Sequence, residues 1–274
     1  MIPAPFEYAR PQALEEAVSL LVHHGDEAKL LAGGHSLLPL MKLRVATPSL
    51  LIDIGRLSDL RYIRDGGDHV AIGALARHHD LETSALLERE APLLRHAAGF
   101  VGDPQVRHRG TIGGCLAHAD PAADLPAVVV ALEAIVVAYG PRGERAIPAR
   151  DFFRSMFGSA LAPDEVLVEV RVPKVGDRRW AFQKFNRRSI DWAIVGVAAV
   201  ESDGGVNIAL VNMGPTPIRA LETEAALRRG ASPSEASALA DRGTEPLSDL
   251  NASAEYRRHL ARVLVRRSLE QIRG

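Results

Sequence analysis

The sequence predicts an α+β protein built from three consecutive parts. In residues 1–55, short apolar strands alternate with helices, which is the pattern of a small parallel βαβ unit. Residues 56–172 combine strand hairpins with helices and predict a larger mixed sheet, and residues 173–274 predict an antiparallel sheet followed by helices. With 274 residues, 47% of them hydrophobic, the chain can bury a core in more than one domain.

In the first part, strand FEYA precedes a helix over residues 12–24. Apolar residues recur in that helix at a spacing of three and four, and Gly25 is a stop signal. Strand AKLLA then leads into the glycine pair at 33–34, which is followed by a short helix, SLLPLMKL, and a strand, SLLIDI. Strands and helices therefore alternate up to residue 55.

In the second part, RYIRD and HVAIGA predict a hairpin around Gly66 and Gly67. The segments LETSALLEREAPLLRHAA and DLPAVVVAL are helical in pattern, and EAIVVAYG with GERAI predicts another hairpin. DEVLVEVRVP alternates apolar and charged residues, which is typical of an edge strand or a half-exposed strand.

In the third part, RWAFQKFN, AIVGVAAVE and VNIALVNM predict a three-stranded antiparallel meander. Helices are expected over ALETEAALRRG, SPSEASALAD and SAEYRRHLARVLVRRSLEQI. The arginines of the last helix are interpreted as a solvated face, in preference to a partner surface.

Two glycine pairs, one in LLAGGHSLLPL and one in RGTIGGCLAHADPAADLP, indicate a divided cradle for a dinucleotide pyrophosphate. Glycine lets backbone N–H groups approach an anion closely, and a helix that begins just after such a turn favours negative charge there. One isolated pair is more often only a tight turn. Two pairs, each flanked by strand or helix signals and each with a nearby hydroxyl, favour binding. The residues concerned are Gly33, Gly34, Ser36, Thr111, Gly113 and Gly114.

Composition and the single cysteine exclude several classes of function for this chain. The 33 basic and 34 acidic side chains give a net charge of −1 and no basic footprint for nucleic acid. The apolar run LPAVVVAL is too short to span a bilayer and MIPAPFEYARP lacks signal-peptide features, so a cytoplasmic protein is expected. The single cysteine, Cys115, cannot form an intramolecular disulfide or by itself hold an iron–sulfur cluster. Adjacent His78 and His79 do not face one ligand, and no metal site is expected.

Longer motifs carry a family resemblance. AGGHSLLPLMKLR, LIDIGRL and GDPQVRHRGTIGGCLAHADPAADLPAVVVAL resemble the FAD-binding medium subunit of the molybdenum hydroxylases, the xanthine dehydrogenase and carbon monoxide dehydrogenase family. DFFRSMFGSALAPDEVLVEVRVP, FQKFNRRSIDWAIVGVAA and NASAEYRRHLARVLVRRSL extend the likeness over nearly the whole chain. The resemblance implies FAD as cofactor, a two-part FAD-binding domain of the vanillyl-alcohol-oxidase (PCMH) type over residues 1–55 and 56–172, and a flavoprotein C-terminal domain over 173–274.

The resemblance also implies which residues contact FAD. The turn at Gly33 and the segment at Thr111 would hold the pyrophosphate from two sides. Asp124 would accept a hydrogen bond from a ribose or adenine donor, or else serve as a helix N-cap, and Lys184 would lie near the flavin ring or else face solvent. Trp192 stands where the family often has tyrosine, and Cys115 replaces a smaller polar or amide residue. The full set, with no catalytic residue, is Leu30, Leu31, Ala32, Gly33, Gly34, His35, Ser36, Gly102, Gln105, Gly110, Thr111, Ile112, Gly113, Gly114, Cys115, His118, Asp124, Leu167, Lys184 and Trp192.

The function implied by the resemblance is electron transfer. A large subunit with a molybdenum cofactor would oxidise the substrate, and a small subunit with two [2Fe–2S] clusters would pass electrons to FAD on this chain. NAD, a quinone or oxygen would be the terminal acceptor, and a dimer of heterotrimers is usual for the family. Two alternatives remain: a stand-alone FAD-dependent oxidase or reductase, and a non-enzymatic nucleotide-binding module, which predicts a colourless protein.

Overall fold

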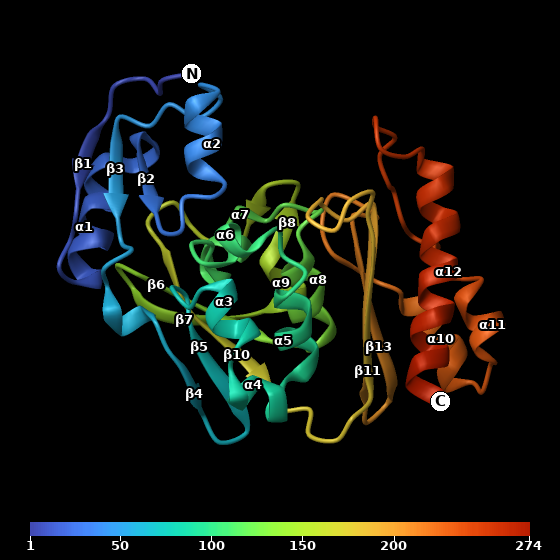
Figure 1. The fold of residues 1–274 in the computed structure, drawn as a ribbon. Helices are drawn as coiled ribbons and strands as arrows, with labels where there is room; N and C mark the ends of the chain where they lie inside the picture. The colour runs from blue at the N-terminus through green and yellow to red at the C-terminus, as the bar shows by residue number, and fades with distance from the viewer.

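The computed structural model describes residues 1–274 and shows the three parts side by side (Figure 1). The N-terminal part forms a small lobe at one end, and the C-terminal helices lie at the other end. The predicted α+β class is confirmed, with one small parallel sheet and two larger antiparallel sheets. The division of the chain at residues 55 and 172 stays a prediction.

The first sheet is parallel and has the order β1-β3-β2. Its strands are β1 (Glu7–Ala9), β2 (Ala28–Leu31) and β3 (Leu50–Asp53), and its helices are α1 (Leu14–His24) and α2 (Leu37–Lys42). The most apolar strand, β3, takes the central position, and its first three residues are buried. Every predicted element of this part is present.

The second sheet has the order β4-β5-β10-β6-β7. Its strands are β4 (Ile63–Asp65), β5 (His69–Gly73), β6 (Ile135–Gly140), β7 (Gly143–Pro148) and β10 (Val166–Pro173). Both predicted hairpins are confirmed. All of its strand pairs are antiparallel, so this sheet is not mixed, because its strands join through hairpins and through a long helical excursion that returns in the opposite direction.

Strand β10 is the central strand of this sheet, and the prediction of an edge or half-exposed strand was wrong. Its charged residues are neutralised by neighbours. Glu169, which is buried, accepts hydrogen bonds from Tyr62 Oη at 2.7 Å and from Arg171 Nε at 2.6 Å. An alternation of apolar and charged residues therefore does not show that a strand is exposed to solvent, because neighbouring side chains can satisfy a buried charge.

Helices fill the long connection between β5 and β6. They are α3 (His78–Glu82), α4 (Ala85–Glu90), α5 (Pro92–Ala98), α6 (Pro104–Arg107), α7 (Ile112–His118) and α8 (Asp124–Ala131). Between β7 and β10 lie α9 (Ala149–Phe152) and the small pair β8 (Phe153–Ser155) and β9 (Gly158–Ser159). All residues of α8 are buried, because this helix lies between the second sheet and the third.

The third sheet is the predicted antiparallel meander with one short strand added. Its order is β11 (Trp180–Phe185), β12 (Val195–Ser202), β13 (Gly205–Val211) and β14 (Ile218–Arg219). Helices α10 (Leu221–Arg228), α11 (Pro233–Ser237) and α12 (Ala254–Arg273) follow, and α12 packs on β11 and β12. One arginine of α12, Arg257, is 2% exposed and binds Asp249 at 2.7 Å, so the arginines of this helix do not all share a solvated face.

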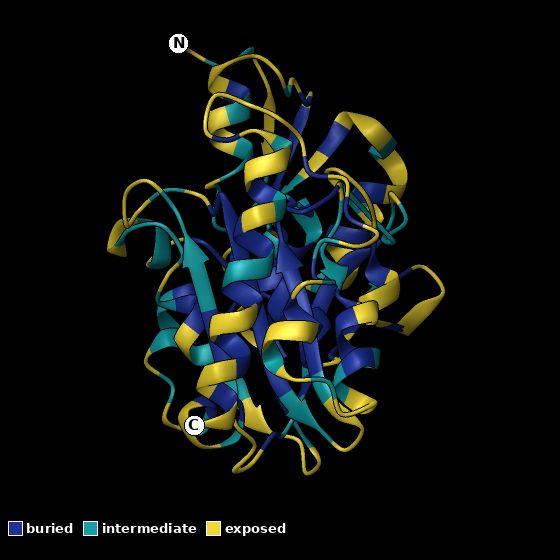
Figure 2. Cartoon of the chain, turned by 90° about the vertical axis from the view of Figure 1, so that its right-hand side faces the viewer, coloured by how far each residue is buried: buried dark blue, intermediate teal, exposed yellow.

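The buried side chains form three clusters, and Figure 2 shows them concentrated in the middle of the molecule. Strand β10 belongs to two of these clusters. Val166 and Val168 pack with the N-terminal part. Val170 and Val172 pack with the helices of the second part. The pairing of β10 with β6 shifts in register between Leu167 and Glu169. Both faces of the second sheet are therefore covered. No helix of the structure combines the length and the apolar character that crossing a bilayer requires.

Candidate functional site

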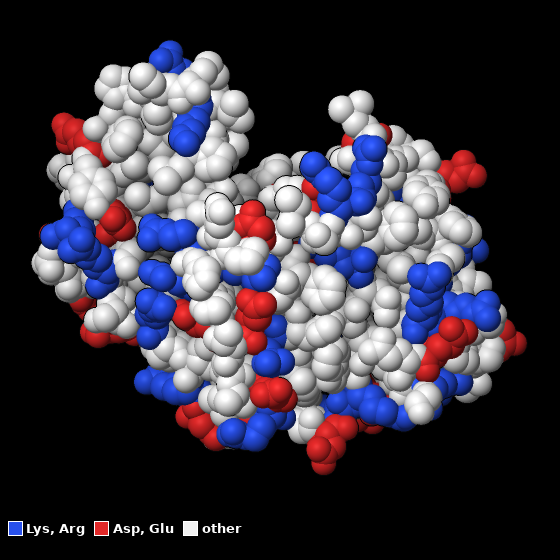
Figure 3. Space-filling model, in the orientation of Figure 1, with Lys and Arg blue, Asp and Glu red and all other residues white.

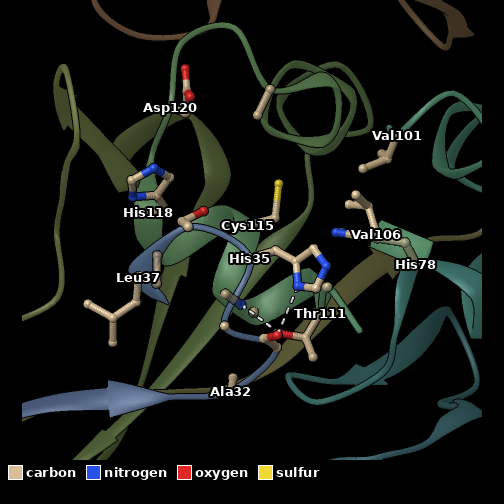
Figure 4. A pocket seen from close by; sticks show the side chains of 18 of the residues that line it. Ala32, His35, Leu37, His78, Val101, Val106, Thr111, Cys115, His118 and Asp120 are labelled. Carbon is tan, nitrogen blue, oxygen red and sulfur yellow. Dashed lines mark hydrogen bonds between the residues drawn. The ribbon is translucent and has the colours of Figure 1, made fainter. Parts of the chain in front are cut away.

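A cleft of about 520 Å³ lies where the three parts of the chain meet. Its walls are the segment between β2 and α2, helix α7 with the residues leading into it, and β11 with the loop that follows. Figure 4 shows side chains from the first two walls around a common space. All but two of the residues singled out in the sequence line it: Leu30, Leu31, Ala32, Gly33, Gly34, His35, Ser36, Gly102, Gly110, Thr111, Gly113, Gly114, Cys115, His118, Asp124, Leu167, Lys184 and Trp192.

The two exceptions, Gln105 and Ile112, do not line the cleft, and the contact of the whole set with FAD stays a prediction. Gln105 is exposed on α6, and the neighbouring Val106 is the residue that faces the cleft. Ile112 is fully buried in the core of the second part. In both cases successive helical residues point in directions about 100° apart, so a continuous run of sequence cannot all face one cavity.

The two glycine segments touch each other, as the sequence predicted. A Cβ atom on Gly33 would lie 2.8 Å from Gly110 Cα and nearer still to the carbonyl oxygen of Arg109. Only glycine permits this approach of two backbones. Gly34 also has a positive φ of +77°, a conformation that glycine adopts readily. Glycine at both positions is therefore required by geometry.

The first turn presents a run of unpaired amides. The backbone N–H groups of Gly33, Gly34, His35 and Ser36 have no hydrogen-bond partner within the chain. The Ser36 hydroxyl is also unpaired at the start of α2. The ring of His35 turns back and donates from Nδ1 to the carbonyl of Gly33 at 3.0 Å, which braces the turn (Figure 4). Free amides at a turn before a helix form an anion-binding concavity.

The second glycine pair is not a turn, and this corrects the interpretation of the sequence. Gly113 and Gly114 lie in the first turn of α7, whose N-cap is Thr111. The amide of Gly113 is bound by the carbonyl of Ala74 at 2.9 Å, and that of Gly114 by Thr111 Oγ1 at 3.1 Å. The second segment therefore does not offer these two amides to an anion. It offers the Thr111 hydroxyl proton and the open surface beside Gly114.

Also in the lining of the cleft, Lys184 and Asp124 form a buried ion pair. Lys184 Nζ lies 2.7 Å from Asp124 Oδ2, and the two side chains are 2% and 3% exposed. The ammonium also donates to the carbonyl of Phe100 at 2.9 Å. Lys184 is therefore not a solvent-facing residue, and Asp124 pairs with it instead of acting as the N-cap of α8, a position held by Ala123.

The carboxyl of Asp124 is incompletely satisfied. Burial raises its pKa to about 6, and the adjacent Lys184 ammonium opposes that rise. Its second oxygen, Oδ1, is buried and has no partner within the chain. A buried acceptor without a donor is costly, so Oδ1 is suited to a hydrogen bond from a ligand in the cleft.

His78 is a residue of the cleft that sequence reasoning missed. It is 4% exposed, its Nδ1 is buried without a partner, and a Cβ on Gly110 would lie 2.9 Å from its Nε2. Burial lowers its pKa to about 4, so the imidazole is neutral near pH 7. Nothing in the local pattern identifies it, because its place in the cleft depends on the pairing of Arg77 with Thr111.

Two further titratable side chains of the cleft, Cys115 and His118, have shifted pKa values. Burial, Asp124 and Asp120 raise the pKa of the Cys115 thiol to about 12, so the reactive thiolate is not populated near neutral pH. Burial lowers the pKa of His118, whose ring lies beside Phe157. No group of three or more His, Cys, Asp or Glu side chains is placed to hold a metal ion.

Trp192 differs from the buried residues around it. Its side chain is 61% exposed at the margin of the cleft, and the adjacent Asp191 is held by Arg188 at 3.0 Å. The cleft is therefore enclosed at Lys184 and open beside Trp192.

Comparison with known proteins gives consistent matches along the chain. Residues 4–175 match the family "FAD binding domain in molybdopterin dehydrogenase", and residues 180–272 match "CO dehydrogenase flavoprotein C-terminal domain". The carbon monoxide dehydrogenase medium chain of Hydrogenophaga pseudoflava is 45% identical over 279 residues, covering 98% of this chain and 97% of that protein.

A second relative is named after a different substrate. The 6-hydroxypseudooxynicotine dehydrogenase complex subunit alpha of Paenarthrobacter nicotinovorans is 41% identical over 98% of this chain and 95% of its own length. Among solved structures, carbon monoxide dehydrogenase from H. pseudoflava lacking the Mo-pyranopterin moiety superposes with a TM-score of 0.96 at 45% identity, covering 99% of this chain and 98% of that chain.

Proposed function

Because the chain belongs to the family of FAD-binding medium subunits of the molybdenum hydroxylases, we propose that it carries electrons from iron–sulfur clusters of a partner subunit, through FAD, to a terminal acceptor. A large subunit with the molybdenum cofactor would oxidise the substrate, and a small [2Fe–2S] subunit would lie between the two. A dimer of such heterotrimers would be the assembled enzyme. FAD, when bound, supplies a carrier that exchanges electrons singly or in pairs.

One observation supports the binding site above all others. The residues from Gly33 to Ser36, whose amides are unpaired, line a cleft whose other wall begins at Thr111. A pyrophosphate carries negative charge, and backbone amides with nearby hydroxyls bind such groups without a cationic side chain. These residues would hold the pyrophosphate of FAD, with the first segment supplying amides and the second supplying the Thr111 hydroxyl.

The enclosed end of the cleft suits the flavin ring. Lys184 would place its ammonium near the pyrimidine end of the ring, where a positive charge favours the reduced, negatively charged form, and the paired Asp124 carboxylate offsets part of that effect. Asp124 Oδ1, which has no donor in the chain, would accept a hydrogen bond from the cofactor. The exposed Trp192 would cover the ring at the open margin, where electrons or an acceptor arrive.

The protonation states support electron transfer over acid–base chemistry on an organic substrate. A general base or acid works best with a pKa near the operating pH. The pKa of His78 is about 4 and that of Cys115 about 12, so neither exchanges protons near pH 7. Asp124, whose pKa is nearer to neutral, is already bound to Lys184.

The proposal is tested by cofactor binding and turnover. The purified chain should be yellow or become yellow with one equivalent of FAD, and it should show little substrate turnover alone. Gly114→Val should lower FAD affinity at least tenfold, because a branched side chain would fill the surface beside Thr111. Gly204→Val is the matched control, because space around that glycine is open.

The outcomes separate the competing functions. A visible spectrum unchanged by excess FAD would contradict a flavin function of any kind. Turnover of an organic substrate by the isolated yellow chain would favour a stand-alone oxidase or reductase. Co-purification with an iron–sulfur chain and a molybdenum-containing chain supports the subunit role, and flavin reduction only in their presence supports the direction of electron flow.

A further inference from the structure

A second cavity, of about 380 Å³, lies beside the first and shares with it the turn at Gly33–Gly34 and residue Thr111. Its lining differs in kind from that of the main cleft. Four arginines contribute to it, and they define what is called here the arginine pocket: Arg56, Arg61, Arg77 and Arg109.

Most of this positive charge is uncompensated. Arg61 is held by Asp80 through two hydrogen bonds of 3.0 Å. No carboxylate of the chain forms an ion pair with Arg56, Arg77 or Arg109, among all the ion pairs that the structure contains. Three guanidinium groups around one cavity therefore form no ion pair, although the charge of Arg77 also acts on Asp80 and lowers its pKa.

The one acidic residue that lines the pocket is already engaged. Asp53 accepts a hydrogen bond from Tyr8 Oη at 2.6 Å and another from the Gly55 amide at 2.8 Å. Its carboxylate is directed to these donors, so it offsets only part of the charge of the arginines.

The concentration of charge is local. The chain as a whole has a net charge of −1, yet Lys and Arg side chains gather below the N-terminal lobe on the face shown in Figure 3. A concave site with one sign of charge raises the local concentration of ions of opposite sign. The pocket is therefore suited to an anion and not to an apolar ligand.

We propose that the arginine pocket binds a phosphate group, either inorganic phosphate or the phosphoryl group of a small molecule, at a site separate from the main cleft. Planar guanidinium groups bind tetrahedral oxyanions through paired, charge-assisted hydrogen bonds. None of the four arginines lines the main cleft. A phosphate held by their guanidinium groups would therefore occupy a different position from a ligand of the main cleft.

The pocket also joins two parts of the chain. The N-terminal part contributes Asp53 and the turn at Gly33–Gly34, whereas all four arginines belong to the second part. A phosphate bound by both would hold them together, and its binding should therefore appear as stabilisation of the folded chain.

The experiment titrates inorganic phosphate into the FAD-loaded full-length chain at constant ionic strength, with calorimetry and thermal unfolding as readouts. FAD keeps the main cleft filled, so phosphate is not bound there. Saturable binding is expected, with a Tm rise of about 3–6 °C at tenfold excess over the dissociation constant. Arg56→Gln combined with Arg109→Gln should weaken binding at least tenfold, whereas Arg229→Gln, at an exposed arginine of the third part, should not.

Both variant positions in the double substitution are exposed, so folding should be preserved, and Arg109→Gln alone provides a milder test. The proposal is overturned if phosphate does not saturate, or if the double variant binds it as tightly as the parent. If the chain does not take up FAD, the titration is repeated on the unloaded chain. There, a loss of phosphate binding in Gly114→Val instead of the arginine variant would place the anion in the main cleft and also overturn the proposal.

Discussion

At the scale of single residues, the cleft is defined by polar atoms that the chain leaves unpaired. Asp124 Oδ1 and His78 Nδ1 are buried without partners; of the other buried side-chain atoms without a partner, Arg95 Nε, Thr223 Oγ1 and Arg257 Nε, none belongs to a residue of the cleft. Buried polar groups without partners are uncommon and costly in stable folds. Their presence in the cleft that also contains the free amides of the first turn indicates that a ligand completes the site.

His78 gives a prediction on pH dependence. Its pKa is about 4 in the folded chain and ordinarily about 6.5, so the folded state binds fewer protons than the unfolded state between these values. Its contribution to stability is therefore complete above pH 6.5 and is lost as the pH falls toward 4. Urea unfolding at fixed cofactor loading should show the parent losing about 3 kcal/mol relative to His78→Asn over this range.

The control for this measurement is His79→Asn. The side chain of His79 is 41% exposed on the same helix, so this variant tests whether the loss of any histidine from the helix produces the same change. A His78→Asn variant whose stability difference from the parent stays constant between pH 7 and pH 4 would show that this imidazole is not protected in the folded chain.

At the scale of elements, the two adjacent glycines of helix α7 have different roles, one in packing and one at the cleft. A Cβ on Gly113 would lie 2.6 Å from the Cβ of Ala74 and 2.7 Å from its carbonyl oxygen, whereas a Cβ on Gly114 would approach only Thr111 Oγ1, at 2.9 Å. Gly113 is therefore needed where the helix packs against the end of β5, and Gly114 is needed where the helix faces the cleft.

This division predicts opposite outcomes for two alanine substitutions. Gly113→Ala should lower the free energy of unfolding by about 1–3 kcal/mol, because backbone atoms must move to admit the methyl group. Gly114→Ala should leave stability unchanged or slightly higher, since alanine favours a helix, while FAD binds more weakly. Chemical denaturation and flavin titration of both variants measure the two effects. Equal stability losses at the two positions would contradict the assignment.

At the scale of the whole molecule, one ligand site unites three parts of the chain. The cleft takes residues from the parallel sheet, from the helices on the second sheet and from the third sheet. A ligand that contacts all three should stabilise them together. FAD at about 100 times its dissociation constant should add about 2.7 kcal/mol to the free energy of unfolding.

Both tryptophans, Trp180 and Trp192, lie in the third part, so their fluorescence reports unfolding there, and circular dichroism reports the whole chain. FAD should raise both transition temperatures equally, by about 5–11 °C. The Gly114→Val variant serves as the control that lacks cofactor. If FAD raised the dichroism transition and not the fluorescence transition, the third part would have no share in the site.

The sequence by itself determined the class of fold, the strands of the parallel sheet and the main strands of the other two sheets, the longer helices, and most of the residues that line the cleft. These features follow from local patterns: apolar periodicity, glycine pairs, and long motifs shared with a family. The contact between the two glycine segments was also predicted. Two anion-binding segments that are separated in the sequence can bind one diphosphate only if they lie close together in the folded chain.

Only the tertiary structure decided how individual groups are used. In the structure, β10 lies in the centre of its sheet and the side chain of Ile112 lies in the core. The amides of Gly113 and Gly114 donate to acceptors within the chain. Asp124 pairs with Lys184 in the cleft. The tertiary structure also brought His78 into the cleft and three unpaired arginines around a second cavity. The physical reason is that burial, hydrogen-bond partners and charge pairing depend on residues distant in the chain, and a local pattern carries no information about them.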